Sequence, residues 1–239
     1  PLYAVSFSGF YLAMIVILLA LILRPVGFKF RGKIADRRWR DTWDWVLFVG
    51  GAVPALIFGV AVGNVLLGAP FHFDGSMRAF YTGNFFQLLM PFALLCGLVS
   101  LGMIATQGAA VIAGRTDGML AERGRRLGIW TGLATIALFA LGGVWAAFLD
   151  GHVIASVTDP NAPINPLAKT VDLVRGGWLS NYATYPWMVA APLLGLAGMA
   201  LAVLSLFSRW RLMALLATSL GIAGIISTAG LSLFPFLLP

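Results

Sequence analysis

Long apolar segments alternate with short basic ones along this chain, and that alternation limits the possible folds more than any other feature. A helix needs roughly 20 apolar residues to cross the hydrocarbon core of a bilayer, which is about 30 Å thick. Of the 239 residues, 60% are hydrophobic and only 10% are charged, whereas soluble domains carry about 25% charged residues. The sequence therefore predicts an all-α fold, a polytopic bundle of transmembrane helices forming one domain in a lipid bilayer.

Six segments have the length and composition of membrane spans. They cover approximately residues 2–23, 45–67, 85–113, 129–149, 185–207 and 212–238. The chain begins at Pro1 without a methionine and ends in an apolar stretch, so we expect it to be a piece of a longer protein. Pro25 is predicted to end the first helix, and Pro54 and Pro91 are predicted to kink the second and third.

The basic residues are concentrated in every second loop. They follow the first, third and fifth spans: Arg24, Lys29, Arg31, Lys33, Arg37, Arg38 and Arg40, then Arg115, Arg123, Arg125 and Arg126, then Arg209 and Arg211. Cytoplasmic loops carry such an excess, so we expect these loops in the cytoplasm and the N-terminus on the periplasmic side of a bacterial inner membrane. The net charge of +7 therefore indicates membrane topology, and no nucleic-acid partner is expected.

Side chains that could carry chemistry are scarce. The only histidines, His72 and His152, fall in predicted outer loops, where neither can ligate a haem inside the bilayer. The chain has one cysteine, Cys96, and no GxSxG, HExxH or CxxC motif. We expect no catalytic residue, no metal site and no haem bound by this chain alone.

Small and polar residues inside the spans indicate helix packing. Gly59 and Gly63 form a GxxxG pair on the second span, which lets helix backbones approach closely in lipid. Asn64, beside them, is expected to hydrogen-bond between helices. In the fourth loop, a segment at about 166–179 is interpreted as a short helix lying in the interface.

Two charged residues near the cytoplasmic ends of spans are candidate functional residues. Asp44, at the start of the second span, either pairs with a loop arginine or contributes to a proton entry route. Arg24 either snorkels to the interface or meets an anionic group, such as a carboxylate or a cofactor propionate in a partner subunit. Asn84 and Gln87, in the run Asn84-Phe-Phe-Gln87, are either helix-packing residues or contacts for a quinone head group.

Several strings resemble subunit II of cytochrome bd-type quinol oxidases, the CydB-like family. In family order they are Ser8-Gly-Phe-Tyr11, Arg24-Pro-Val-Gly-Phe28, Trp39-Arg-Asp-Thr-Trp-Asp44, Val53-Pro54, Gly59-Val-Ala-Val-Gly-Asn64, Tyr81-Thr-Gly-Asn-Phe-Phe-Gln87, Gln107-Gly-Ala109, Gly143-Val-Trp145, Asp150-Gly151, Asn165-Pro-Leu167 and Ser232-Leu-Phe-Pro-Phe236. Any one string is weak evidence, but the ordered set covers essentially the whole chain.

The resemblance implies an eight-helix family fold, of which this chain looks like the middle six spans. It implies a haem-bearing partner, subunit I, that carries haem b, haem d and the quinol site. The complex would oxidise quinol, reduce oxygen to water and take protons from the cytoplasm. Subunit II would stabilise subunit I, provide access for protons or oxygen, or hold a structural quinone. Acidic residues implicated in proton delivery lie at the family's N-terminal part and cannot be mapped onto this chain.

Two other functions fit a polytopic helical chain. A small-solute transporter would place a polar site on broken helices at mid-membrane, but no cluster of polar residues accompanies Pro54 and Pro91. A purely structural membrane subunit, without a quinone or proton role, is the third interpretation.

Overall fold

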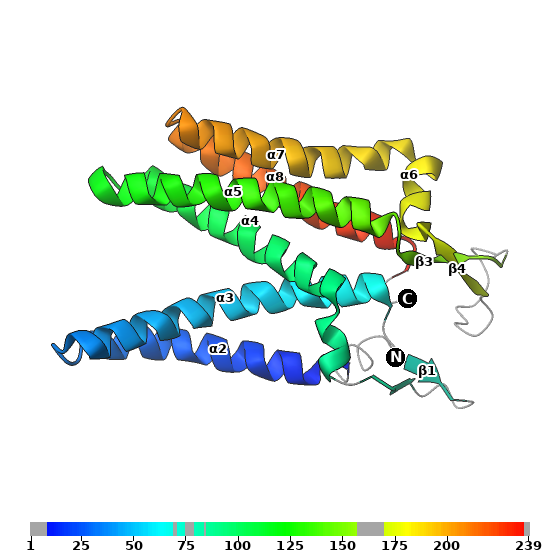
Figure 1. Ribbon diagram of the computed structural model, residues 1–239, viewed down its shortest axis with the longest axis horizontal. Helices are drawn as coiled ribbons and strands as arrows, with labels where there is room; N and C mark the ends of the chain where they lie inside the picture. Colours follow the sequence, from blue (N-terminus) through cyan, green and yellow to red (C-terminus); the bar gives the residue numbers. More distant parts are fainter. Residues whose placement is uncertain (1–8, 69–70, 75–78, 84, 157–169, 237–239) are drawn as a thin grey trace, which may run out of the picture. The chain divides into compact units, whose positions relative to one another are not determined.

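Six long apolar helices dominate the structure, a computed structural model that describes residues 9–68, 71–74, 79–83, 85–156 and 170–236. They are α2 (Tyr11–Phe30), α3 (Arg37–Leu67), α4 (Pro91–Arg115), α5 (Gly118–Ala146), α7 (Ala190–Phe207) and α8 (Arg211–Leu233) (Figure 1). All six are long and apolar enough to cross a membrane, α7 together with the preceding turn η4 (Pro186–Val189). The predicted six-span helical class is confirmed.

The chain forms two compact units, residues 1–105 and 106–237, and α4 contributes to both. In the first unit α2 packs against α3 as an antiparallel pair (Figure 1). A short hairpin of β1 (Phe71–Phe73) and β2 (Ala79–Tyr81) follows α3, and the 3-10 helix η1 (Phe85–Leu89) contacts α3.

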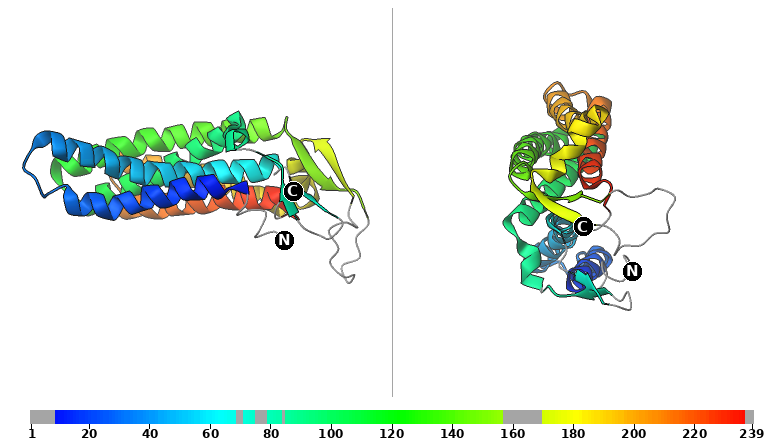
Figure 2. Two further views of the ribbon diagram at one scale, coloured as in Figure 1. Left: turned by 90° about the horizontal axis from the view of Figure 1, so that it is seen from below. Right: turned by 90° about the vertical axis from the view of Figure 1, so that its right-hand side faces the viewer.

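In the second unit α7 packs against both α8 and α5. The α7–α8 pair runs side by side in Figures 1 and 2. Between α5 and α7 lie the antiparallel strands β3 (Asp150–Ile154) and β4 (Val171–Arg175), then η3 (Gly177–Leu179) and α6 (Ser180–Thr184). The amide of Asn181 donates to Leu231 O at 3.0 Å, which ties α6 to the end of α8.

Glycines set the closest helix approach in this unit. A Cβ on Gly198 of α7 would lie 2.6 Å from the Cα of Gly221 on α8, far inside van der Waals contact. A buried core of Ala110, Ile129, Val203, Leu206 and Ala214 joins α4, α5, α7 and α8. Because lipid tails are as apolar as these side chains, close backbone packing rather than the hydrophobic effect holds such helices together.

Three predictions about local structure are wrong. Pro25 lies inside α2, which continues to Phe30, because leaving the helix early would unpair several backbone groups where lipid offers no replacement. Pro91 does not kink a helix but begins α4, where its missing N–H would be unpaired anyway. The segment expected to be a helix at about 166–179 is mostly a strand in its described part, 170–179: β4 gains a hydrogen-bonded partner in β3, and only Gly177–Leu179 form a short 3-10 helix, η3.

The helix bounds also differ from the predicted spans, since a count of apolar residues omits the N-terminal turns in which charged residues are frequent. Helix α3 begins at Arg37 and α5 at Gly118, both ahead of the apolar residues that define spans 45–67 and 129–149. Pro54 lies inside α3 and is buried.

Candidate functional site

The close approach of α2 and α3 positions Arg24. A Cβ on Gly50 of α3 would lie 2.8 Å from Arg24 Cγ and 2.9 Å from Ala20 O, so only glycine leaves room for the arginine stem. The neighbouring Gly51 faces open space, with nothing within 4 Å of its Cβ position. Arg24 itself is exposed, and among the described residues its guanidinium makes no ion pair. The structure thus holds a charged group on the outside of the hairpin without neutralising it.

Asp44 pairs with a loop arginine. Arg31, directly after α2, donates Nη2–H to Asp44 Oδ2 at 2.9 Å and Nε–H to Asp44 Oδ1, a two-bond fork. The side chains are 47% and 48% exposed. The hydrogen bond that Arg31 donates to Asp44 raises the pKa of Arg31 above its ordinary value. This pairing is the first of the two interpretations of Asp44, and it ties the end of α2 to the start of α3.

Aromatic rings fill the same end of the hairpin. Trp39 Nε1–H donates to Phe30 O at 2.9 Å. The rings of Trp39 and Trp43 meet edge-on with centroids 5.7 Å apart, and Phe30 stacks on Trp43 at 5.8 Å. Their contribution was not predicted from the sequence, although two tryptophans near a span start were a usable signal. The rings and the Arg31–Asp44 pair together fix the turn between α2 and α3, and most basic residues of the first unit lie in this turn or in the helix ends beside it.

The predicted quinone contacts fall on and beside η1. Asn84 lies outside the described residues. Gln87 lies on η1 and is exposed. Asn64 of α3 is only 6% exposed, and its amide donates to Val60 O at 2.8 Å and to Leu88 O at 2.7 Å. Asn64 therefore holds η1 against α3, a positioning role that the sequence predicted only as a general hydrogen bond between helices.

Gly59 and Gly63 lie where α3 meets α4. A Cβ on Gly59 would stand 2.6 Å from Ser100 Cβ and 2.7 Å from Gly97 Cα. A Cβ on Gly63 would stand 2.6 Å from Ala93 Cα. Both glycines thus permit backbone contact with the first part of α4 and leave no space for a ligand.

Both histidines lie outside the long helices. His72 is in β1 and His152 in β3. The His152 ring lies 5.8 Å from the ring of Trp178, which is 2% exposed, and 6.2 Å from that of Phe236. Burial lowers the pKa of His152, so the ring is neutral at pH 7. Within the described ranges no three histidine, cysteine, aspartate or glutamate side chains cluster as metal ligands would.

The fold is that of a chain with six helices long and apolar enough to cross a membrane, and few side chains in its described part could ligate a metal. The sequence model of the family described as cytochrome bd terminal oxidase subunit II matches residues 1–239, and the chain belongs to that family.

Two relatives with high sequence identity agree with this assignment. The chain is 48% identical to cytochrome bd-I ubiquinol oxidase subunit 2 of Escherichia coli K12 and 45% identical to a probable cytochrome oxidase subunit 2 of Haemophilus influenzae, each over 99% of this chain. It spans 63% of the length of either relative. A solved bd oxidase from Geobacillus thermodenitrificans matches 94% of this chain and 68% of its own, with 14% identity and a TM-score of 0.41.

Proposed function

We propose that this chain serves as the membrane subunit II of a quinol:oxygen oxidoreductase of the cytochrome bd type. The family match over residues 1–239 carries the proposal, and the name of the Escherichia coli relative specifies a ubiquinol oxidase subunit. The complex would oxidise quinol, reduce oxygen to water and take its protons from the cytoplasm. Subunit II would contribute the helix surface that stabilises the haem-bearing subunit I.

The placement of the histidines supports a haem-free role. Haem iron is most often held by histidine, and here His72 and His152 lie on short strands outside the long helices. The neutral His152 ring is packed against Trp178. Haem b and haem d would therefore be ligated by the partner, and the redox chemistry would occur there.

Arg24 is the residue that we propose contacts the partner. It is exposed and unpaired among the described residues, and its stem is held by the Gly50 backbone. A guanidinium in this state suits a carboxylate or a haem propionate of subunit I, because its planar fork binds such groups through two hydrogen bonds. For Asp44 we propose a structural role through Arg31, with proton entry as the alternative.

A quinone contact on η1 is a second, finer proposal. Gln87 carries an amide and is exposed, and the neighbouring Phe86 is an aromatic residue that is 79% exposed. An amide donor beside an aromatic surface fits a carbonyl-bearing ring, and Asn64 would keep the segment in place. The same geometry also fits a structural subunit that holds no quinone.

We propose an orientation in a bacterial inner membrane from the charge pattern alone. Most basic residues lie in the turns after α2, α4 and α7 or in the helix ends beside them, and these turns would face the cytoplasm under the positive-inside rule. The end of the chain that precedes α2 would then lie on the periplasmic side.

The test is a purification from native membranes through a tag on the full-length protein that carries this chain, followed by a reduced-minus-oxidised absorption spectrum. We expect bands of b- and d-type haems together with quinol-dependent oxygen uptake. A folded, monodisperse and haem-free preparation would contradict the oxidase function and would direct attention to transport assays.

The Arg24 contact is tested by Arg24→Ala in the same complex, with Gly50→Ala as a second perturbation and Gly51→Ala as the matched control. We expect loss of haem or oxygen uptake in the first two and none in the control, because a Cβ on Gly50 would meet the arginine stem and a Cβ on Gly51 would meet nothing within 4 Å. Full haem content and full oxygen consumption in Arg24→Ala would exclude the contact.

A further inference from the structure

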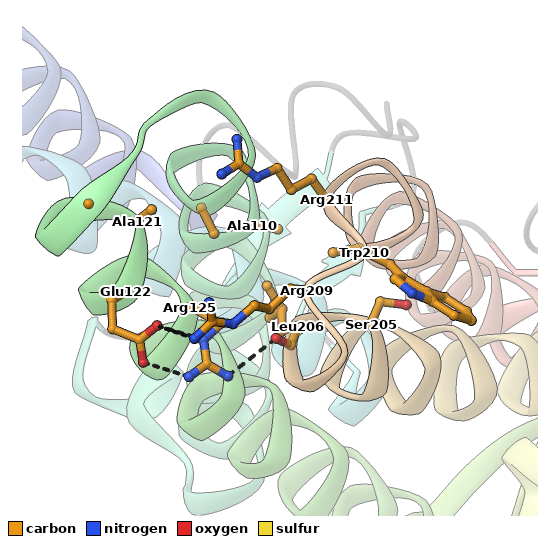
Figure 3. A pocket seen from close by; sticks show the side chains of 12 residues that line it. Ala110, Ala121, Glu122, Arg125, Ser205, Leu206, Arg209, Trp210 and Arg211 are labelled. Carbon is orange, nitrogen blue, oxygen red and sulfur yellow. Dashed lines mark hydrogen bonds and ion pairs between the residues drawn. The ribbon is translucent and has the colours of Figure 1, made fainter.

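A pocket in the second unit is not used by the proposed function. It has a volume of about 220 Å³ and lies where the end of α4, the start of α5, the end of α7 and the start of α8 meet. Its polar lining consists of Glu122, Arg125, Ser205, Arg209, Trp210 and Arg211 (Figure 3). Small-molecule sites usually measure about 300–1,000 Å³, so this pocket suits a single small polar group better than a nucleotide.

The charge at the pocket is positive. The three guanidinium groups belong to Arg125, Arg209 and Arg211, and the two carboxylates near them belong to Glu122 and Asp117. Arg125 pairs with Glu122 through Nε at 3.0 Å, and Arg211 pairs with Asp117 at 2.7 Å. Arg209 lies 3.8 Å from Glu122, without a hydrogen bond to it, and is 75% exposed. Arg125 also donates to Leu206 O at 3.5 Å, which holds its guanidinium across the end of α7. One positive charge at the mouth is therefore left over for an anion.

Ser205 supplies an independent indication of a ligand. It lines the pocket and is 1% exposed, and its hydroxyl has no hydrogen-bond partner within the described part of the chain. Several helical hydroxyls in this protein bond back to their own helix, as Thr218 does to Ala214 O at 3.0 Å. A buried hydroxyl that lacks such a bond is uncommon and calls for a partner that the protein itself does not provide.

The backbone at Arg209 is the third observation. Helix α7 ends in a Schellman motif, with Trp210 N–H bonded to Ser205 O at 2.9 Å and Arg209 N–H to Leu206 O at 3.4 Å. Arg209 occupies the left-handed position of that motif with φ of 59°, where glycine is free of strain. Strained residues are concentrated at functional sites, and here the strain presents an arginine side chain at the pocket mouth.

We propose that this pocket binds a phosphate group, presented either by an anionic phospholipid head group or by free phosphate. Arg209 would supply the forked guanidinium donors that match phosphate oxygens, Arg125 would add charge, and the Ser205 hydroxyl would donate to one oxygen at the pocket base. Trp210, 62% exposed at the rim, suits the head-group level of a membrane, where indole rings are enriched.

The experiment measures the melting temperature and the dissociation constant in the purified, delipidated complex. One arm is titrated with short-chain phosphatidylglycerol, one with inorganic phosphate and one with short-chain phosphatidylcholine. Arg209→Gly is the decisive variant, because it removes the side chain while relieving the backbone strain, so that folding is retained. Arg123→Gln, an exposed arginine on α5 that does not line the pocket, is the matched control.

We expect an anionic ligand to raise the melting temperature of the parent and of Arg123→Gln. Loss of one charged hydrogen-bond partner should weaken binding about ten- to a hundredfold in Arg209→Gly, and Ser205→Ala should weaken it about two- to tenfold. A response to phosphatidylglycerol alone identifies a lipid site, and an equal response to inorganic phosphate identifies a soluble anion. Equal affinity in Arg209→Gly and the control, or a response in no arm, overturns the proposal.

Discussion

Replacing Gly59 by alanine should separate α3 from α4. The new methyl carbon would stand 2.6 Å from Ser100 Cβ and 2.7 Å from Gly97 Cα, whereas carbon atoms pack at about 3.5–4.0 Å. The helices must therefore move apart by about 1 Å, and the contacts on either side of Gly59 weaken with them. Overpacking of this kind costs about 1–3 kcal/mol, of which about 1 kcal/mol is offset because alanine is the better helix former.

Gly51→Ala is the matched control for this substitution. It lies on the same helix, and nothing lies within 4 Å of its Cβ position, so it brings the helix-propensity gain without the clash. The two variants should therefore differ in stability by about 1–3 kcal/mol, which corresponds to about 2–12 °C in melting temperature for a chain of this size.

The assay is thermal melting of the purified complex in one detergent, followed by tryptophan fluorescence and by loss of the haem spectrum. Gly59→Ala should melt below the parent or close to it, and Gly51→Ala at or above the parent. Equal melting temperatures for the two variants would refute the argument that backbone contact at Gly59 holds α3 and α4 together.

Three further predictions follow from single side chains. Asn64→Leu leaves Leu88 O without its donor and should lower the free energy of unfolding by about 1–3 kcal/mol, measured by thermal melting. If η1 binds a quinone, the bound quinone should be lost in parallel. Unchanged stability would mean that η1 is held by other contacts. Burial lowers the pKa of His152 below its ordinary value of 6.5, so the unfolded chain binds more protons and stability should fall as the pH drops below about 6.5. Melting measured from pH 8 to 5 should show a smaller fall in His152→Gln. Asp44→Asn removes the ion pair with Arg31, so it should lower the melting temperature at low salt and not at high salt, with oxygen uptake unchanged. Slow oxygen uptake with an altered pH profile would instead favour a role of Asp44 in proton entry.

The apolar runs alone predicted the number and approximate place of the six helices. This succeeds because backbone groups in lipid must pair within their own segment, so a long apolar run has almost no alternative to a helix. The same rule explains why the helix does not end before Pro25 as predicted. The steric preference of the residue before a proline is weaker than the requirement that all backbone groups at the end of α2 stay hydrogen-bonded. The family assignment likewise came from ordered local strings, which need no tertiary information.

Contacts between distant residues required the structure. The sequence offered Asp44 a choice of several arginines, and only the packing of α2 on α3 selects Arg31. Likewise, nothing local distinguishes Gly50 from Gly51, yet one touches Arg24 and the other faces open space. The strand β4 forms where a helix was predicted because its hydrogen-bond partner, β3, lies about twenty residues earlier in the chain.

The pocket around Arg209 shows most clearly the difference between what the sequence predicts and what only the tertiary structure shows. Its arginines were visible in the sequence as topology signals, but nothing in the sequence brings Glu122 and Arg125 of α5 to the same place as Ser205 and Arg209 at the end of α7. Helix formation depends on near neighbours and on the solvent, so sequence alone determined the helical membrane class and the family. Which side chains meet depends on small residues that let particular helices approach at particular points, so only the tertiary structure decided the sites.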